Sequence, residues 1–132
     1  MTGTDTIPGN LYYGGFDLGA PELPDARMVS ICLEWIGKYC RPRKTINNAH
    51  GSYGLKHVVE TWATSRRATG TEYISNGSLI AAFIRAGYRC VREGDGPNAV
   101  FNFQYIGPKV GERGCTKRMP YAAKEWAAVE DQ

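Results

Sequence analysis

Two segments in the middle of the chain decide the fold: SYGLKHVVETW at residues 52–62 and SNGSLIAAFIRA at residues 75–86. In both, apolar residues recur three and four positions apart, a spacing that places them on one face of an α-helix. A serine opens each segment, as is common at helix N-termini, and Gly87 follows the second. The sequence therefore predicts two amphipathic helices, joined by a polar link at residues 64–74.

A β-hairpin is predicted directly after these helices. Residues 88–93 and 99–106 are two runs rich in β-favouring residues, joined by a Gly-Asp-Gly-Pro turn. In the second run Phe101, Phe103 and Tyr105 occupy alternate positions, so their rings share one face of the strand. We expect that face to pack against the helices, and a platform on which nucleic-acid bases stack is the alternative.

Another amphipathic helix is predicted before residue 52. Asp25 is a suitable N-cap, and the apolar residues after it form one helical stripe, consisting of Met28, Cys32, Trp35, Ile36 and Tyr39. This helix should end near Cys40, because Pro42 cannot continue it. Residues 45–51 are polar and indicate a loop.

The two ends of the chain differ in composition. Residues 1–24 contain five glycines and three prolines, which disfavour a helix. We expect residues 11–16 either to add an edge strand or to lie over the core as an ordered arm. Residues 121–130 are rich in alanine and predict a short helix, which should dock on the body through Trp126.

Together these elements predict a compact α+β fold of winged-helix type, with three helices, a β-hairpin as the wing and a short C-terminal helix. The 132 residues are enough for one domain with a hydrophobic core. We divide the chain into an acidic N-terminal arm (1–24), a core domain (25–106), and a basic connector with the C-terminal helix (107–132). The link at residues 64–74 is longer than the compact turn of a simple helix-turn-helix.

The charge of the chain is unevenly distributed. Residues 1–25 carry four acidic residues and no basic residue, whereas residues 38–118 carry fourteen basic residues against five acidic ones. Residues 119–132 are acidic again, and the net charge of the whole chain is +3. A basic centre favours a polyanionic partner, although solvated lysines and arginines on an ordinary surface give the same composition.

We predict that basic residues of this centre, with one serine of the helix at 75–86, bind a partner or a nucleic acid: Arg41, Arg43, Lys44, Lys56, Arg66, Arg67, Ser78, Arg85, Arg89 and Arg92. The outward face of that helix is expected to carry Ser78, Ala81, Ala82 and Arg85. Long polar donors that read base edges are scarce on this face. Small residues instead permit close approach of a backbone or of another helix, so this face favours packing or protein contact.

The sequence does not indicate an enzyme, a cofactor or a metal site. Its four cysteines contain no Cys-x-x-Cys pair, which argues against a zinc ribbon. His50 and His57 are seven residues apart and have no third ligand in register. The absence of a signal peptide and of a long apolar run predicts a cytoplasmic protein of the host cell with no membrane partner.

Four segments form a pattern that resembles small accessory proteins of phages and other mobile elements: SYGLKH at 52–57, YISNG at 73–77, AAFIRAGY at 81–88 and PNAVFN at 97–102. The resemblance covers residues 44–106, about half of the chain. Such proteins mostly have no assigned activity, so the resemblance implies no catalytic residue. It implies a genomic context in which small accessory proteins are often DNA-binding regulators or inhibitors of host defence, such as anti-CRISPR proteins.

Three classes of function remain open. The first is a non-enzymatic binding protein that inhibits a host defence nucleoprotein complex, such as a CRISPR effector. It would place its basic centre on a nucleic-acid channel or its acidic arm on a basic groove. The second is a DNA-binding winged helix-turn-helix regulator. The third is a small nuclease that uses His57 and Glu60 with Arg66 and Arg67.

Overall fold

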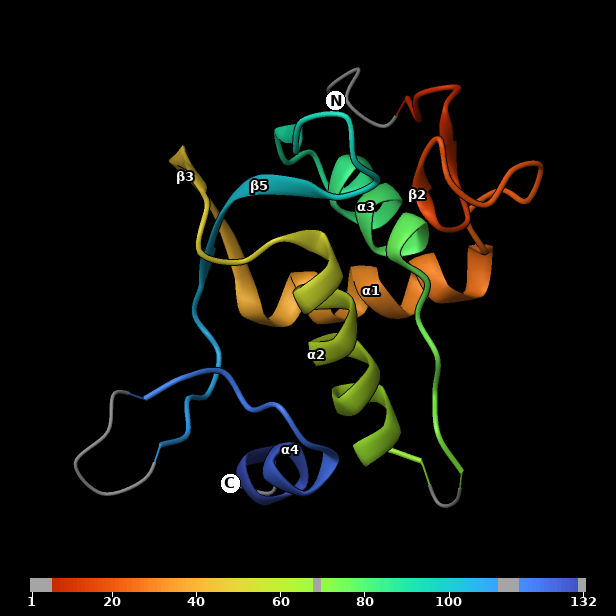
Figure 1. Ribbon diagram of the computed structural model, residues 1–132. Helices are drawn as coiled ribbons and strands as arrows, with labels where there is room; N and C mark the ends of the chain where they lie inside the picture. The colour runs from red at the N-terminus through yellow and green to blue at the C-terminus, as the bar shows by residue number, and fades with distance from the viewer. Residues whose placement is uncertain (1–5, 68–69, 112–116, 131–132) are drawn as a thin grey trace.

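The computed structural model of the protein describes residues 6–67, 70–111 and 117–130. The described residues contain four helices: α1 (Ala26–Tyr39), α2 (Ser52–Ser65), α3 (Asn76–Arg85) and α4 (Ala123–Glu130). Five short strands accompany them: β1 (Leu11–Tyr12), β2 (Gly15–Phe16), β3 (Cys40–Asn47), β4 (Cys90–Arg92) and β5 (Ala99–Tyr105). The strands form two antiparallel sheets, β1-β2 and β3-β5-β4. The α+β class is thus confirmed, and Figure 1 shows α1 behind α2, with the larger sheet to one side.

The helices begin where capping chemistry places them. The Asp25 carboxylate accepts a hydrogen bond of 2.9 Å from the backbone N–H of Met28 at the start of α1. The Ser75 hydroxyl accepts one of 3.1 Å from the backbone N–H of Ser78 at the start of α3. Both predicted caps are therefore confirmed. The predicted stripe of α1 is also buried, except that Met28 is half-buried.

Strand β3 differs from the prediction. The segment after Cys40 was expected to leave the helix and pass into a loop, but residues 40–47 pair with β5 as an edge strand. Pro42 stands opposite Phe103, and the register shifts between Pro42 and Asn47. An edge strand tolerates a proline because one side of its backbone needs no ladder hydrogen bond. The hairpin of β4 and β5 is confirmed, with Cys90 opposite Phe101.

The rings of β5 lie in the core. Phe101 stacks on Phe83 of α3 with 4.1 Å between ring centroids, and Phe103 lies 5.5 Å from the same ring. Phe101 and Phe103 are completely buried, while Tyr105 is half-buried and stacks on Trp35 of α1. The alternative that these three rings form a base-stacking platform is therefore wrong for this strand.

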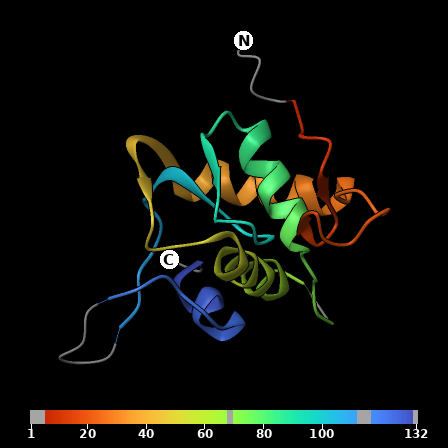
Figure 2. The ribbon, with the colours of Figure 1, turned by 45° about the horizontal axis from the view of Figure 1, so that its top comes forward.

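The third helix is buried on all sides until its last residue. Every residue from Asn76 to Ile84 is buried, and Arg85 is exposed. The start of α1 and the arm of β1 and β2 together cover the face that was expected to point outward, and both ribbon views show the arm beside α3 (Figure 2). The backbone N–H of Gly77 donates to the carbonyl of Tyr13 at 2.9 Å. The small residues on α3 thus allow another segment of backbone to approach closely. The prediction that the outer face of α3 is exposed is wrong.

A winged-helix arrangement is not confirmed. In such a fold the third helix would present its outer face to the DNA major groove. Here the arm and the start of α1 occupy that position, and the hydroxyl of Ser78 accepts a hydrogen bond of 2.9 Å from the backbone N–H of Asp25, the N-cap of α1. The arm was expected to lie over the core or to add an edge strand, and it does the former with a two-stranded sheet of its own.

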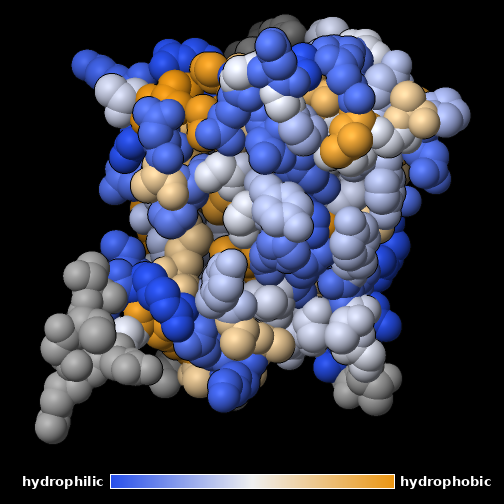
Figure 3. All heavy atoms as spheres, in the orientation of Figure 1, coloured by the Kyte–Doolittle hydropathy of each residue, from blue (hydrophilic) through white to orange (hydrophobic). Residues whose placement is uncertain are grey.

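The C-terminal helix docks as predicted. Trp126 is completely buried, and its ring lies 5.4 Å from the ring of Tyr39 on α1. In the connector before it, Val110 and Arg118 form an antiparallel bridge. Cys115 lies outside the described residues. Hydrophilic residues cover most of the face turned to the viewer in Figure 3, and a hydrophobic patch gathers at its upper left, near the end of β3.

The link before α3 is held to α1 by a carboxylate between two guanidinium groups. Glu72 accepts hydrogen bonds from Arg27 (3.1 Å to Oε1) and from Arg67 (2.7 Å). These partners hold the pKa of Glu72 at about 2, below its ordinary value of 4.5. Because the folded-state pKa is depressed, the stabilisation is complete above the unfolded value and is lost as pH falls from about 4.5 to about 2.

We therefore expect Glu72→Gln to lower the denaturant midpoint at pH 7, and the midpoints of variant and wild type to converge as the pH approaches 2. Urea unfolding between pH 7 and pH 2 measures this difference. Glu93→Gln is the matched control, since Glu93 is exposed and makes no ion pair with the described residues. If the two variants had equal pH profiles of stability, the pH-dependent stabilisation could not be attributed to Glu72.

Candidate nucleic-acid interface

Strand β3 carries a row of exposed side chains along the edge of the larger sheet. Residues 41–45 are exposed, whereas Cys40 and Asn47 at its ends are buried. The side-chain amide of Asn47 donates to the carbonyl of Phe103 at 3.1 Å, and its oxygen accepts from Ala49 N–H at 3.0 Å. These two bonds fix the end of the strand, so the residues between are presented on an anchored backbone.

Four basic side chains gather on this edge. Arg41, Arg43 and Lys44 come from β3, and Arg89, just before β4, reaches across so that its guanidinium donates to the carbonyl of Lys44 at 3.3 Å. Arg41 donates to the carbonyl of Cys40 at 2.7 Å. Arg43 likewise bonds backbone carbonyls of its own strand. Carbonyls orient these groups but leave their positive charge uncompensated, and no carboxylate of the described residues forms an ion pair with them.

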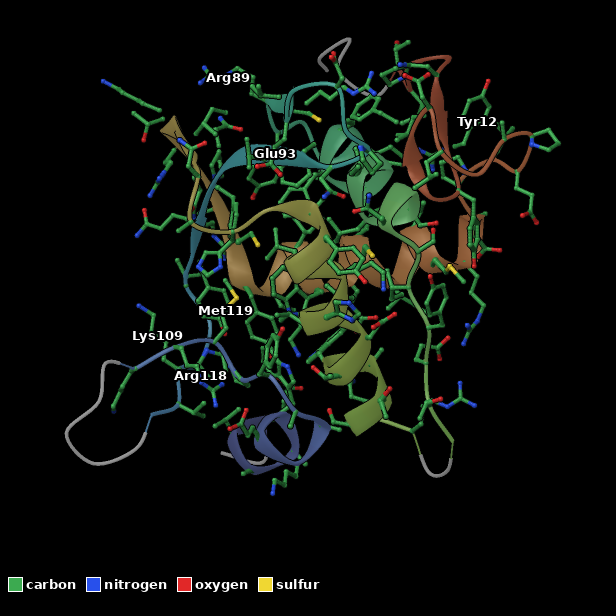
Figure 4. The ribbon with its side chains drawn as sticks, in the orientation of Figure 1. Tyr12, Arg89, Glu93, Lys109, Arg118 and Met119 are labelled. Carbon is green, nitrogen blue, oxygen red and sulfur yellow. The ribbon has the colours of Figure 1, made fainter. Side chains whose placement is uncertain are left out.

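A hollow of about 600 Å³ extends the basic edge toward the connector. Arg43 lines it from β3, and Lys109 and Lys117 line it from the connector; both lysines are exposed and form no ion pair with the described residues. Among the described residues that line the hollow, none is acidic. Figure 4 shows Arg89 at one end of β3 and Lys109 with Arg118 toward the other. We call this region the basic β3 surface, formed by Arg41, Arg43, Lys44, Arg89, Lys109 and Lys117.

Two predicted binding residues are buried. The Lys56 side chain is 5% exposed, and its ammonium donates to Glu60 at 3.0 Å. Ser78 is completely buried against the start of α1, where its hydroxyl accepts from the backbone N–H of Asp25. A long amphipathic lysine on the flank of a helix normally reaches solvent, but here the carboxylate one turn later holds it inward. Neither residue reaches the surface on which the prediction placed it.

Three further predicted residues have acidic partners. Arg66 pairs with Glu34 at 2.9 Å, and Arg92 pairs with Asp17 at 2.9 Å. Arg67 pairs with Glu72, as described above. In each of these ion pairs a carboxylate neutralises positive charge that would otherwise attract a phosphate. Arg85 is exposed at the end of α3, beside a separate apolar groove under the N-terminal arm, and the structure does not bring it to the basic β3 surface.

The sequence prediction missed Lys109 and Lys117. Both belong to the segment that composition already marked as a basic connector, so their charge was visible in the sequence. Their position could not be read from the sequence. It depends on the pairing of β5 with β3 and on the bridge between Val110 and Arg118. Arg118 also lines the hollow, but it pairs with Glu125 of α4 at 2.9 Å.

The described residues do not assemble the catalytic groups that the sequence suggested for a nuclease. Burial raises the pKa of the Cys40 thiol to about 12 and that of Cys90 to about 11, so neither is a thiolate near neutral pH. Partial burial lowers the pKa of His50. His57 and Glu60 do lie 2.9 Å apart, but Arg66 and Arg67 bind other carboxylates instead of joining them. In the part of the chain that the structure describes, no three His, Cys, Asp or Glu side chains are grouped to hold a metal ion.

Comparisons of the chain with models of protein families, with curated proteins and with solved structures found no match. No helix in residues 6–67, 70–111 or 117–130 has both the length and the apolar character needed to cross a membrane.

Proposed function

We propose that this protein is a non-enzymatic binding protein whose basic β3 surface binds the phosphate backbone of a nucleic acid. The observation that carries the proposal is the contrast between the two sets of cations. Arg66, Arg67 and Arg92 are matched by carboxylates, whereas the six cations of the basic β3 surface are exposed and form no ion pair with an acidic residue among the described residues. A patch of that kind attracts phosphates by releasing their counterions.

The wider role that we propose is inhibition of a host defence nucleoprotein complex, such as a CRISPR effector. A protein that covers the phosphates of a nucleic acid competes with the complex that must hold the same strand. The acidic arm supports this role less well, because its Asp17 already pairs with Arg92, and Asp25, directly after the arm, caps α1. The DNA-reading alternative is disfavoured by the burial of α3.

We expect the affinity for a labelled 20-nucleotide strand to fall steeply with salt. If all six cations contact phosphates, log K should fall with log salt with a slope of about −4 for a single strand and about −5 for a duplex. Arg43→Ala combined with Lys44→Ala should make the slope less negative by about 1.5 and weaken binding at least tenfold at low salt. Fluorescence anisotropy at four salt concentrations measures both quantities.

Arg66→Ala combined with Arg67→Ala is the matched control, because it removes the same number of positive charges from another place on the molecule. This variant should keep the wild-type slope. If the two double variants lose affinity equally, net charge and not the basic β3 surface controls binding. The inhibitory role has its own test: wild-type protein should block strand binding by a reconstituted CRISPR effector, and the Arg43 and Lys44 double variant should not.

A further inference from the structure

Segments far apart in the sequence meet around a pocket on a different part of the molecule. The residues that line it come from α2, from the start of α3, from the turn before β5 and from the N-terminal arm: Tyr53, Lys56, Tyr73, Asn76, Pro97, Asn98, Gly14 and Leu18. Figure 1 shows these segments converging where the first turn of α2 faces the start of α3. The pocket has a volume of about 430 Å³, which lies within the range of small-ligand sites.

Two exposed aromatic rings form walls of this pocket. Tyr53 is 56% exposed and Tyr73 is 53% exposed, and Leu18 on the arm is 51% exposed. By contrast, six aromatic side chains are completely buried in the core, namely Trp35, Trp62, Trp126, Phe83, Phe101 and Phe103, while Tyr121 before α4 is exposed like the two pocket tyrosines. Large apolar side chains left exposed around a concave site are typical of a binding surface.

The pocket also contains an almost fully buried cation. The Lys56 ammonium lies 4.7 Å from the ring centroid of Tyr73 and 5.5 Å from that of Tyr53. Its charge is balanced by Glu60, whose carboxylate also accepts a hydrogen bond of 3.0 Å from the backbone N–H of Ile74. A buried lysine is costly unless it is paired in this way. The paired ammonium therefore offers hydrogen-bond donors to a ligand while the site stays nearly neutral.

An amide at the pocket lacks one of its hydrogen bonds. The side-chain nitrogen of Asn76 donates to the carbonyl of Gly14 at 3.1 Å and to Oδ1 of Asn98 at 3.0 Å, which fixes the orientation of the amide. Its oxygen is buried and receives no donor from the described residues. Since buried polar atoms are normally satisfied, this acceptor indicates a donor that a ligand would supply.

We propose that this pocket binds an unpaired nucleobase of a single-stranded nucleic acid. A base offers a flat ring to the exposed parts of Tyr53 and Tyr73, whose rings also contact Lys56 and, for Tyr73, Tyr13. It also offers ring acceptors to the ammonium of Lys56 and an amino group to the oxygen of Asn76. A proline-rich peptide also packs on tyrosines, but its tertiary amides carry no N–H for Asn76. A phosphate fits poorly, because Glu60 already neutralises Lys56. The inference rests on the proposed function, with phosphates bound at the basic β3 surface and a base held here.

The test compares a 20-nucleotide single strand with the same strand made abasic. We expect Tyr53→Ala combined with Tyr73→Ala to weaken binding of the normal strand at least tenfold, without changing the salt slope. Binding of the abasic strand should not change. Both rings are more than half exposed, so their removal should leave the fold intact, and circular dichroism checks this. Phenylalanine at both positions keeps the rings and should keep the affinity.

A second measurement separates this inference from the basic β3 surface. Uncharged nucleosides should shift the NMR signals of the Tyr53 and Tyr73 rings, even in the Arg43 and Lys44 double variant. No shift with any of the four nucleosides would overturn the base pocket and would leave the phosphate surface untouched. Tyrosine variants that lose a proline-rich peptide but retain the normal strand would overturn it as well. If the affinity for the strand did not depend on salt, this result would contradict phosphate binding at the basic β3 surface and would not contradict the base pocket.

Discussion

Gly77→Ala should detach the N-terminal arm and lower the free energy of unfolding by about 3 kcal/mol. A β-carbon on Gly77 would overlap the carbonyl oxygen of Tyr12 and would lie 2.7 Å from that of Tyr13. Backbone atoms cannot move aside as a flexible side chain does, so the arm must leave its place. Leu11 and Phe16, both buried there, would then lose their contacts with the core. Urea unfolding measures the loss, and limited proteolysis locates it in the arm.

Gly37→Ala is the matched control for this prediction. Gly37 is also helical and is exposed on α1, and a β-carbon there meets none of the described residues within 4 Å. Alanine is a better helix former than glycine by up to about 1 kcal/mol, so this variant should be slightly more stable than the wild type. If both substitutions shift stability in the same direction, helix propensity decides the outcome and the close approach of the arm does not.

The elements that were predicted correctly are those whose signals lie within a few residues of one another. Asp25 and Ser75 cap their helices through bonds to residues three positions later, and β4 and β5 are joined by one short turn. Strand β3 depends on pairing with β5, about 60 residues further on, and its polar composition resembles a loop. The exposed face assigned to α3 failed for the same reason, since the arm that covers it is more than 50 residues away.

The same difference between local signals and long-range contacts applies to the candidate sites. Arg41, Arg43 and Lys44 are adjacent in the sequence and remain together at the surface. Composition could not show that Lys56 would be drawn inward, because its burial depends on Tyr73 and on the N-H of Ile74 holding Glu60 in place. The tyrosine pocket could not be predicted either. Most of its parts lie in the segments 52–57, 73–77 and 97–102 that carry the resemblance, and Gly14 and Leu18 come from the N-terminal arm, so only the fold brings them together.

Trp126→Ala should release α4 from the body and weaken nucleic-acid binding as a consequence. The Trp126 ring is completely buried, and replacing such a residue by alanine costs about 3–5 kcal/mol of local packing. A helix of eight residues is too short to be stable alone in water, so α4 should unfold once it is undocked. The pair between Arg118 and Glu125 would break with it, and Lys117 beside Arg118 would lose its fixed position.

Hydrogen exchange and strand binding measure the two parts of this prediction separately. The amide protection of α4 should disappear in Trp126→Ala, and affinity for the 20-nucleotide strand should fall several-fold because the connector side of the basic β3 surface is no longer held. Tyr121→Ala is the matched control, since Tyr121 is an aromatic residue just before α4 that is 59% exposed. It should leave both readouts unchanged. Loss of protection with full affinity would show that Arg41, Arg43, Lys44 and Arg89 suffice without the connector.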